Sequence, residues 1–221
     1  MKNKIKAKPM SQDLKNKIVE GYQKYLLTEG ERPKTVFAFC ETIKIEEAQF
    51  YEHYANFESL EIGFWNELFE RTIGIVKGDE AFDAYNARER TLAFYFTLIE
   101  QLKKNLSYFR LAFGNQPILQ PNSPFAKGVK GLESFFNELI EYGEEQNEIA
   151  KRPMFKKLLV KGFQFHLVFV FKYFMKDTSQ AFAKTDEAIE KSTNLLFDGL
   201  QKGVVDSAFD FAKFMGQNAF A

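Results

Sequence analysis

The spacing of apolar residues predicts helices along most of the chain. Between Lys34 and Leu60, apolar and aromatic side chains recur in two short runs at helical spacing, and a longer third run starts near residue 56. The first run places Val36, Phe39 and Cys40 on one face. We therefore expect two short helices feeding a longer one, which is the pattern of a helix-turn-helix.

The same spacing extends on both sides of this stretch. A first helix has apolar positions from Leu14 to Leu26 and should end at Gly30. The run from Asn115 to Pro124 contains three prolines and reads as a loop, and residues 147–153 read as a second connection. The further predicted helices are 56–73, 84–105, 106–113, 125–143, 154–175, 185–200 and 204–215. The predicted fold class is all-α.

The segment from Met154 to Met175 also alternates apolar and polar residues, as a strand would. It runs for more than twenty residues without a turn signal and has no obvious partner strand. A helix that is apolar all round is expected when one face meets its own core and another meets a partner. We therefore predict a helix.

Aromatic residues are the strongest compositional signal. The 221 residues include 26 Phe and 9 Tyr, and 45% of the chain is hydrophobic. This aromatic content predicts a cavity, a dimer face, or both, in addition to an ordinary core. The single cysteine, Cys40, lies on an apolar helical face and is predicted to be a small buried hydrophobe.

No apolar run precedes Ile18, so no signal peptide is expected and the predicted location is the cytoplasm. Gly162 to Phe171 is very apolar but short and flanked by Lys161 and Lys172, so no membrane span is predicted there.

Charge is unevenly distributed although the net charge is zero. Residues 1–45 hold ten Lys or Arg against five acids, including a basic arm that ends at Pro9, whereas residues 46–70 hold seven Glu and no Lys or Arg. The second short helix carries Glu46, Glu47 and Glu52, which is unusual for a helix that would enter a DNA groove.

Catalytic motifs are absent from the sequence. Two histidines and one cysteine leave no plausible triad, and no Glu-x-x-His pair, Gly-rich phosphate loop or G-x-S-x-G motif occurs. We predict no enzyme activity, no cofactor and no metal site. His166 lies in the most apolar helix, where it is either a hydrogen-bonded core group or a ligand contact.

Twelve positions between Ile18 and Leu60 form a recognisable pattern: Gly30, Thr35, Val36, Phe39, Cys40, Ile45, Phe50, Tyr51, His53, Tyr54, Glu58 and Leu60. With these residues the stretch resembles the N-terminal domain of TetR-type transcriptional regulators. The resemblance implies a DNA-binding domain over residues 1–55 and a ligand-binding and dimerisation domain over residues 56–221. It also implies a homodimer in which residues 154–175 and 185–200 form a four-helix bundle with their symmetry mates.

Departures from the family pattern fall where DNA is contacted. Lys44 replaces the usual turn glycine, Glu46 and Glu47 open the recognition helix, and Phe57 replaces the usual phosphate-contacting lysine. Acids at a helix N-terminus also stabilise the helix dipole, which is the alternative role of the two glutamates. The residues still expected to contact double-stranded DNA are Lys34, Thr35, Lys44, Gln49, Tyr51 and His53, and a glutamate can accept from cytosine.

The resemblance further implies a small-molecule pocket in the larger domain. Its predicted wall is aromatic and poor in charge, which suits a hydrophobic or aromatic molecule with one polar handle, and plain core packing is the alternative. The predicted lining residues are Phe64, Leu98, Phe113, Phe135, Phe136, Phe163, His166 and Val170.

Two functions from different classes remain open. The first is a ligand-responsive repressor of the TetR type that binds operator DNA as a dimer. The second is a protein of the same fold that has lost DNA binding and binds a lipid or other hydrophobic metabolite, like the lipid-binding protein of ubiquinone biosynthesis, which is similar in fold.

Overall fold

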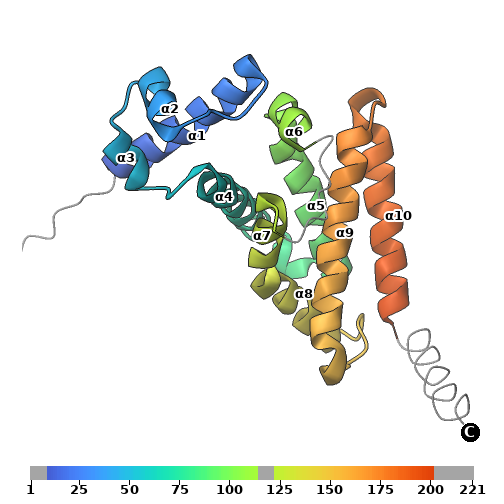
Figure 1. The fold of residues 1–221 in the computed structure, drawn as a ribbon. Coiled ribbons are helices and arrows are strands. Elements are labelled where there is room, and N and C mark those ends of the chain that lie inside the picture. Colours follow the sequence, from blue (N-terminus) through green and yellow to red (C-terminus); the bar gives the residue numbers. More distant parts are fainter. Residues whose placement is uncertain (1–8, 114–121, 202–221) are drawn as a thin grey trace, which may run out of the picture. The chain divides into compact units, whose positions relative to one another are not determined.

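The computed structural model describes residues 9–113 and 122–201, which fold entirely into helices and connections. The described residues form two units, of which the first comprises residues 9–67 with 104–113 and 122–128. The helices that contribute to this unit are α1 (Pro9–Glu29), α2 (Val36–Ile43), α3 (Glu47–Tyr51), the start of α4 (Phe57–Lys77), α6 (Leu106–Phe113) and the start of α7 (Pro124–Gly131) (Figure 1).

The second unit comprises residues 68–103 and 129–201. Three short 3₁₀ turns, Phe82–Ala84, Pro153–Phe155 and Gln180–Phe182, connect its helices. Those helices are the end of α4, α5 (Ala87–Lys103), the end of α7, α8 (Glu133–Glu145), α9 (Lys156–Lys176) and α10 (Ala183–Leu200). The all-α prediction is confirmed for the part of the chain that the structure describes.

The core of the first unit is a cluster of aromatic rings. Phe39 of α2, Phe50 of α3 and Phe57 of α4 meet edge to face, with centroids 5.6–6.1 Å apart. Tyr22 of α1 stacks on Phe57 at 5.4 Å. Because each of these helices contributes a ring to one cluster, the cluster fixes α2 and α3 against α1 and α4.

The second unit is built around α5, α8, α9 and α10. Helices α9 and α10 run side by side in opposite directions, and α5 packs on α10 (Figure 1). A chain of ring contacts joins Phe94 of α5, Phe135 and Phe136 of α8, Phe163 of α9 and Phe197 of α10. These rings account for part of the aromatic content noted in the sequence.

Most predicted helices are found, with two differences in extent. The predicted helix 125–143 is two helices, α7 and α8, separated at Leu132, whose N–H donates to the Val129 carbonyl at 3.1 Å. The predicted helix 84–105 is shorter, because 82–84 forms a separate 3₁₀ turn. Residues 154–175 are helical rather than extended. Most of the predicted loop 115–124 and all of the predicted helix 204–215 lie outside the described residues.

Among the described helices, only Pro153–Lys176 is long and apolar enough to cross a membrane by length and composition. This is weak evidence, because the core helix of a soluble protein passes the same test. Eight α9 side chains, Phe163 and Leu167 among them, are buried within the protein.

Candidate nucleic-acid interface

The helix-turn-helix is defined by its caps. Thr35 precedes α2 in extended conformation, and its Oγ1 accepts a hydrogen bond from the Ala38 N–H at 3.1 Å. Lys44 follows α2 with φ 56° and ψ 61°, and the N–H of Ile45 then donates to the Cys40 carbonyl at 3.1 Å. A left-handed residue at this place turns the chain from α2 into α3.

Helix α3 begins with two hydrogen bonds between Glu46 and Gln49. The backbone N–H of Glu46 donates to Oε1 of Gln49 at 2.9 Å, and the N–H of Gln49 donates to the Glu46 carbonyl at 3.0 Å. Glu47 in the first turn places a negative charge where the helix dipole favours one. The carboxylate of Glu47 therefore stabilises α3 and also contributes to a negative surface.

Hydrogen bonds within the protein also engage three of the residues that were predicted to reach DNA. Partial desolvation and the carboxylate of Glu47, to which the Tyr51 hydroxyl is hydrogen-bonded, raise the pKa of Tyr51. The Gln49 oxygen is committed to the helix cap, and the Lys44 carbonyl accepts from Nζ of Lys17 at 3.0 Å. Part of the hydrogen-bonding capacity of this surface is thus used within the protein.

The six predicted DNA contacts differ in exposure. Lys34 and Thr35 lie together just before α2, Lys44 lies at its other end, and the remaining three lie on or just after α3. Lys34, Thr35, Lys44 and Tyr51 are exposed, whereas Gln49 and His53 are half-buried. Their roles in DNA binding stay predictions.

Phe57 explains one departure from the family pattern. Its ring is buried against Tyr22, Phe39 and Phe50. The first residue of α4 therefore belongs to the aromatic core of this unit and offers no charge to a phosphate.

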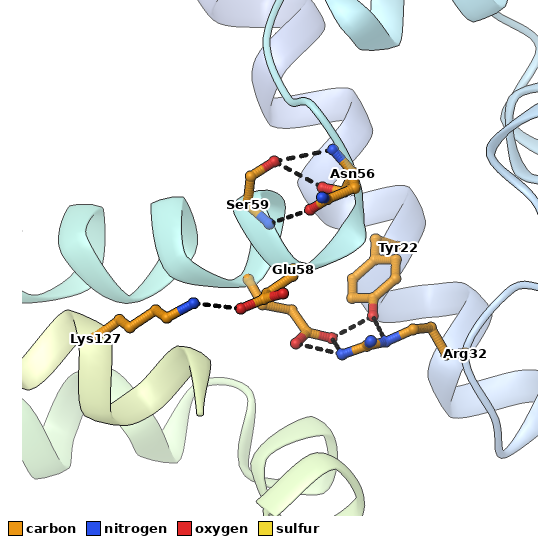
Figure 2. Close-up of polar contacts among 7 residues, drawn as sticks. Tyr22, Arg32, Asn56, Glu58, Ser59 and Lys127 are labelled. Carbon is orange, nitrogen blue, oxygen red and sulfur yellow. Dashed lines mark hydrogen bonds and ion pairs between the residues drawn. The ribbon is translucent and has the colours of Figure 1, made fainter. Parts of the chain in front are cut away.

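A buried polar network stands beside this core. Tyr22 and Arg32 converge on one carboxylate of α4, that of Glu61 (Figure 2). Nη2 of Arg32 donates to both Glu61 oxygens at 2.7 and 2.6 Å, Nε of Arg32 donates to the Tyr22 hydroxyl at 3.2 Å, and that hydroxyl donates to Glu61. Glu61 is only 7% exposed. A carboxylate this buried needs a cationic partner, which the guanidinium of Arg32 provides. Burial, then the Glu61 carboxylate, raises the pKa of Tyr22.

The start of α4 has two further polar contacts. Asn56 caps the helix, as predicted, by accepting from the Ser59 N–H at 2.8 Å, while Ser59 Oγ accepts from the Asn56 N–H at 3.1 Å (Figure 2). In the same first turn, Glu58 accepts from Nζ of Lys127 on α7 at 2.5 Å. The hydrogen bond and charge of Lys127 lower the pKa of Glu58.

Sequence reasoning missed Tyr22, Arg32 and Glu61. Arg32 is 29 residues from Glu61, and Tyr22 is 39 residues away. No helical spacing links them, and the only available signal was one acid, Glu61, between the apolar residues Leu60 and Ile62.

The predicted ligand-lining residues are divided between the two units. Phe64 and Phe113 belong to the first unit, where Phe64 contacts Tyr108 and Phe113 contacts Trp65. The other six belong to the second unit, and five of these are buried: Leu98, Phe135, Phe136, Phe163 and Val170. Whether these side chains line a pocket stays a prediction.

His166 is held by two hydrogen bonds within the second unit. Its Nδ1 lies 3.0 Å from the Tyr95 hydroxyl, and its Nε2 lies 2.7 Å from Oγ of Ser192. Ser192 donates its proton to the Ala188 carbonyl at 2.6 Å, so it accepts from Nε2, and Tyr95 donates to Nδ1. Burial lowers the pKa of His166 to about 4, which keeps the ring neutral as this network requires.

The serine and histidine of this network do not form an activated nucleophile. The Ser192 hydroxyl donates its proton to a backbone carbonyl and not to the imidazole ring. Ser192 also lies inside α10, where the neighbouring backbone N–H groups are used by the helix and cannot form an oxyanion hole.

Across residues 9–113 and 122–201, no group of three or more His, Cys, Asp or Glu side chains is placed to hold a metal ion.

Comparison with known proteins gives a family. A family model described as the C-terminal domain of tetracyclin repressor-like proteins matches residues 90–215, which is more than half of the chain. No curated protein sequence matches significantly.

Solved structures with the same fold include several regulators. A protein of Syntrophomonas wolfei str. Goettingen, assigned to the TetR family of transcriptional regulators, has a TM-score of 0.66 at 12% identity, covering 86% of this chain and 98% of that one. The fatty acid degradation regulator FadR of Bacillus halodurans has a TM-score of 0.57 at 14% identity, with 84% and 99% covered. The TetR family transcriptional regulator PfmR of Thermus thermophilus has a TM-score of 0.51 at 16% identity, with 84% and 99% covered.

Proposed function

Because the chain belongs to the TetR family of transcriptional regulators, we propose that it is a ligand-responsive repressor that binds operator DNA as a homodimer in the cytoplasm. In this proposal residues 1–55 read DNA, and residues 56–221 bind a small hydrophobic effector and dimerise. Filling of the effector pocket changes the spacing of the two DNA-reading heads.

The observation that carries the proposal is the complete helix-turn-helix scaffold. Thr35 caps α2, Lys44 forms the turn, and the buried rings of Phe39 and Phe50 hold α2 to α3. This scaffold presents Lys34 and Lys44, both exposed, at the two ends of α2. Lysines at these places suit contacts to the phosphate backbone.

Dimerisation is supported by an exposed apolar stripe on α9. Leu158, Phe165 and Phe169 are spaced by seven and four residues, and they are 62%, 65% and 44% exposed. Leu195 on α10 is 74% exposed. Such side chains on neighbouring helices are typical of a surface that packs against a second copy, and residues 154–175 and 185–200 would form that four-helix bundle.

The acidic face of α3 favours a second candidate function. Glu46 and Glu52 are exposed, and the Tyr51 hydroxyl is bonded to Glu47. Carboxylates near backbone phosphates weaken DNA binding. The alternative is therefore a TetR-fold protein that has lost DNA binding and binds a lipid or other hydrophobic metabolite.

An electrophoretic mobility shift with the DNA upstream of the chain's own gene separates the two functions. The repressor retards a specific fragment at both low and moderate salt. If no fragment binds above the non-specific level, and the double variant Glu46→Ser with Glu47→Lys gains binding, the repressor function is wrong. The variant Glu20→Ser with Glu29→Lys makes the same charge change at exposed positions of α1 and serves as the matched control.

A further inference from the structure

We propose that Glu61, acting through Arg32 and Tyr22, holds the N-terminus of α2 in the position from which Lys34 and Thr35 reach DNA. Glu61 itself lies on α4 and acts on DNA affinity only through these two partners. Glu61 is a positioning residue in this inference, which rests on the proposed DNA-binding function.

The connection from Arg32 to α2 is short. Only Pro33 and Lys34 separate Arg32 from Thr35, the cap of α2. Pro33 is buried, and its ring fixes one backbone dihedral. The three peptide steps from Arg32 to Thr35 span at most roughly 11 Å, so a guanidinium anchored on α4 limits how far the α2 N-terminus can move independently.

The anchor itself is strong for an ion pair on this unit. Glu61 receives both hydrogen bonds from Nη2 of Arg32 and a third from the hydroxyl of Tyr22, and its side chain is only 9% exposed. By contrast, the side chains of the Lys15–Glu67 pair, which joins α1 to α4 at 2.9 Å, are 31% and 30% exposed. Buried, multiply bonded pairs cost more to break than half-exposed ones.

The same face of α4 makes a second contact. Glu58, three residues before Glu61, is bonded to Lys127 of α7, and Arg32 also acts on its charge (Figure 2). The first two turns of α4 thus make a contact to α7 and a contact to the α1–α2 loop. A shift of α4 at this point is passed to Arg32, because the carboxylate of Glu61 cannot leave its partners without becoming an unpaired buried charge.

Amide hydrogen exchange on the full-length protein tests the positioning without DNA. The Ala38 N–H donates to Thr35 Oγ1 and the Phe39 N–H donates to the Thr35 carbonyl at 3.2 Å, so both amides report on the α2 N-terminus. We expect Glu61→Gln and Arg32→Gln to speed exchange at these two amides by about tenfold, and Tyr22→Phe by less. Glu67→Gln, which breaks the Lys15–Glu67 pair between α1 and α4, leaves them unchanged.

The same variants are then measured for affinity to the specific DNA fragment. Glu61→Gln and Arg32→Gln weaken binding by about five- to tenfold, and the double variant weakens it by less than the product of the two, since both remove one interaction. If Glu61→Gln fails to fold, Arg32→Gln and Tyr22→Phe still test the inference. The Arg32 side chain is half exposed, and Tyr22→Phe keeps the buried ring.

Unchanged exchange at Ala38 and Phe39 overturns the inference. It is also overturned if the wild type binds DNA specifically and a variant with faster exchange at these amides binds the same DNA as tightly as the wild type. A wild type that binds no DNA overturns the proposed function instead, and the exchange rates still decide whether Glu61 positions α2.

Discussion

Lys44 occupies a backbone conformation that suits glycine. Its φ of 56° costs a residue with a Cβ atom about 1 kcal/mol relative to glycine. We expect Lys44→Gly to raise the free energy of unfolding by about 0.5–1 kcal/mol, measured by urea denaturation.

Lys44→Ala is the matched control for this prediction. It removes the same charge and the same flexible side chain but keeps the Cβ, so it should leave stability unchanged within about 0.5 kcal/mol. Equal gains from both variants would assign the effect to charge and contradict the backbone explanation.

His166 makes the stability of the protein depend on pH. Burial lowers its pKa to about 4, below the ordinary value of 6.5, so the unfolded chain binds a proton more readily than the folded one. The stabilisation is fully present above pH 6.5 and is lost as pH falls toward 4. We expect the free energy of unfolding of the wild type, relative to that of His166→Phe, to fall by about 2–3 kcal/mol between pH 7 and pH 4. Thermal or urea unfolding at the two pH values measures this change.

A pH-independent difference between these two proteins would contradict the assignment of His166 as a buried neutral group. Acidic residues titrate over the same range, but they are common to both proteins and cancel in the comparison.

At the scale of elements, close helix packing depends on Gly143 in α8. A Cβ placed there would lie 2.8 Å from Cδ1 of Ile149 and 3.1 Å from Cβ of Ala87, the first residue of α5. We expect Gly143→Ala to lower the free energy of unfolding by about 1–3 kcal/mol. Gly74→Ala in α4, where a Cβ meets nothing within 4 Å, should instead raise it by up to about 1 kcal/mol.

Elements with local signals were predictable from the sequence. Gly30 ends α1 with φ 75°, Thr35 caps α2 and Asn56 caps α4, and each acts on residues within four positions. The break at Leu132 was missed, because apolar side chains continue across it at helical spacing from Val129 to Phe136.

Contacts between distant parts of the chain were not predictable. The partners of Glu61 come from α1 and the α1–α2 loop, and those of His166 come from α5 and α10. Partners that are 26 or more residues apart are not related by helical spacing, so the sequence pattern does not indicate them. The site residues that depend on such hydrogen bonds could be identified only from the folded structure.

For the whole molecule, the exposed stripe on α9 leads to a prediction about assembly. We expect a dimer at micromolar concentration by analytical ultracentrifugation, and we expect Phe165→Asp to weaken it at least about tenfold by placing a charge in the apolar contact. Phe37→Asp on α2, where the side chain is 60% exposed against 65% for Phe165, should leave the dimer intact.

A wild-type protein that sediments as a monomer would refute the dimer. Equal weakening by both variants would show that dimerisation does not depend on the α9 stripe in particular.

The burial of Phe57 bears on how this chain can change in evolution. Exposed acids such as Glu46 can be exchanged one at a time at little cost to folding. A lysine at position 57 would instead bring a charge among the rings of Tyr22, Phe39 and Phe50, so neighbouring positions would have to change first. Single mutations at the start of α3 can therefore strengthen phosphate binding, whereas a single mutation at the start of α4 cannot. Descendants of this sequence should vary at the start of α3 before they vary at Phe57.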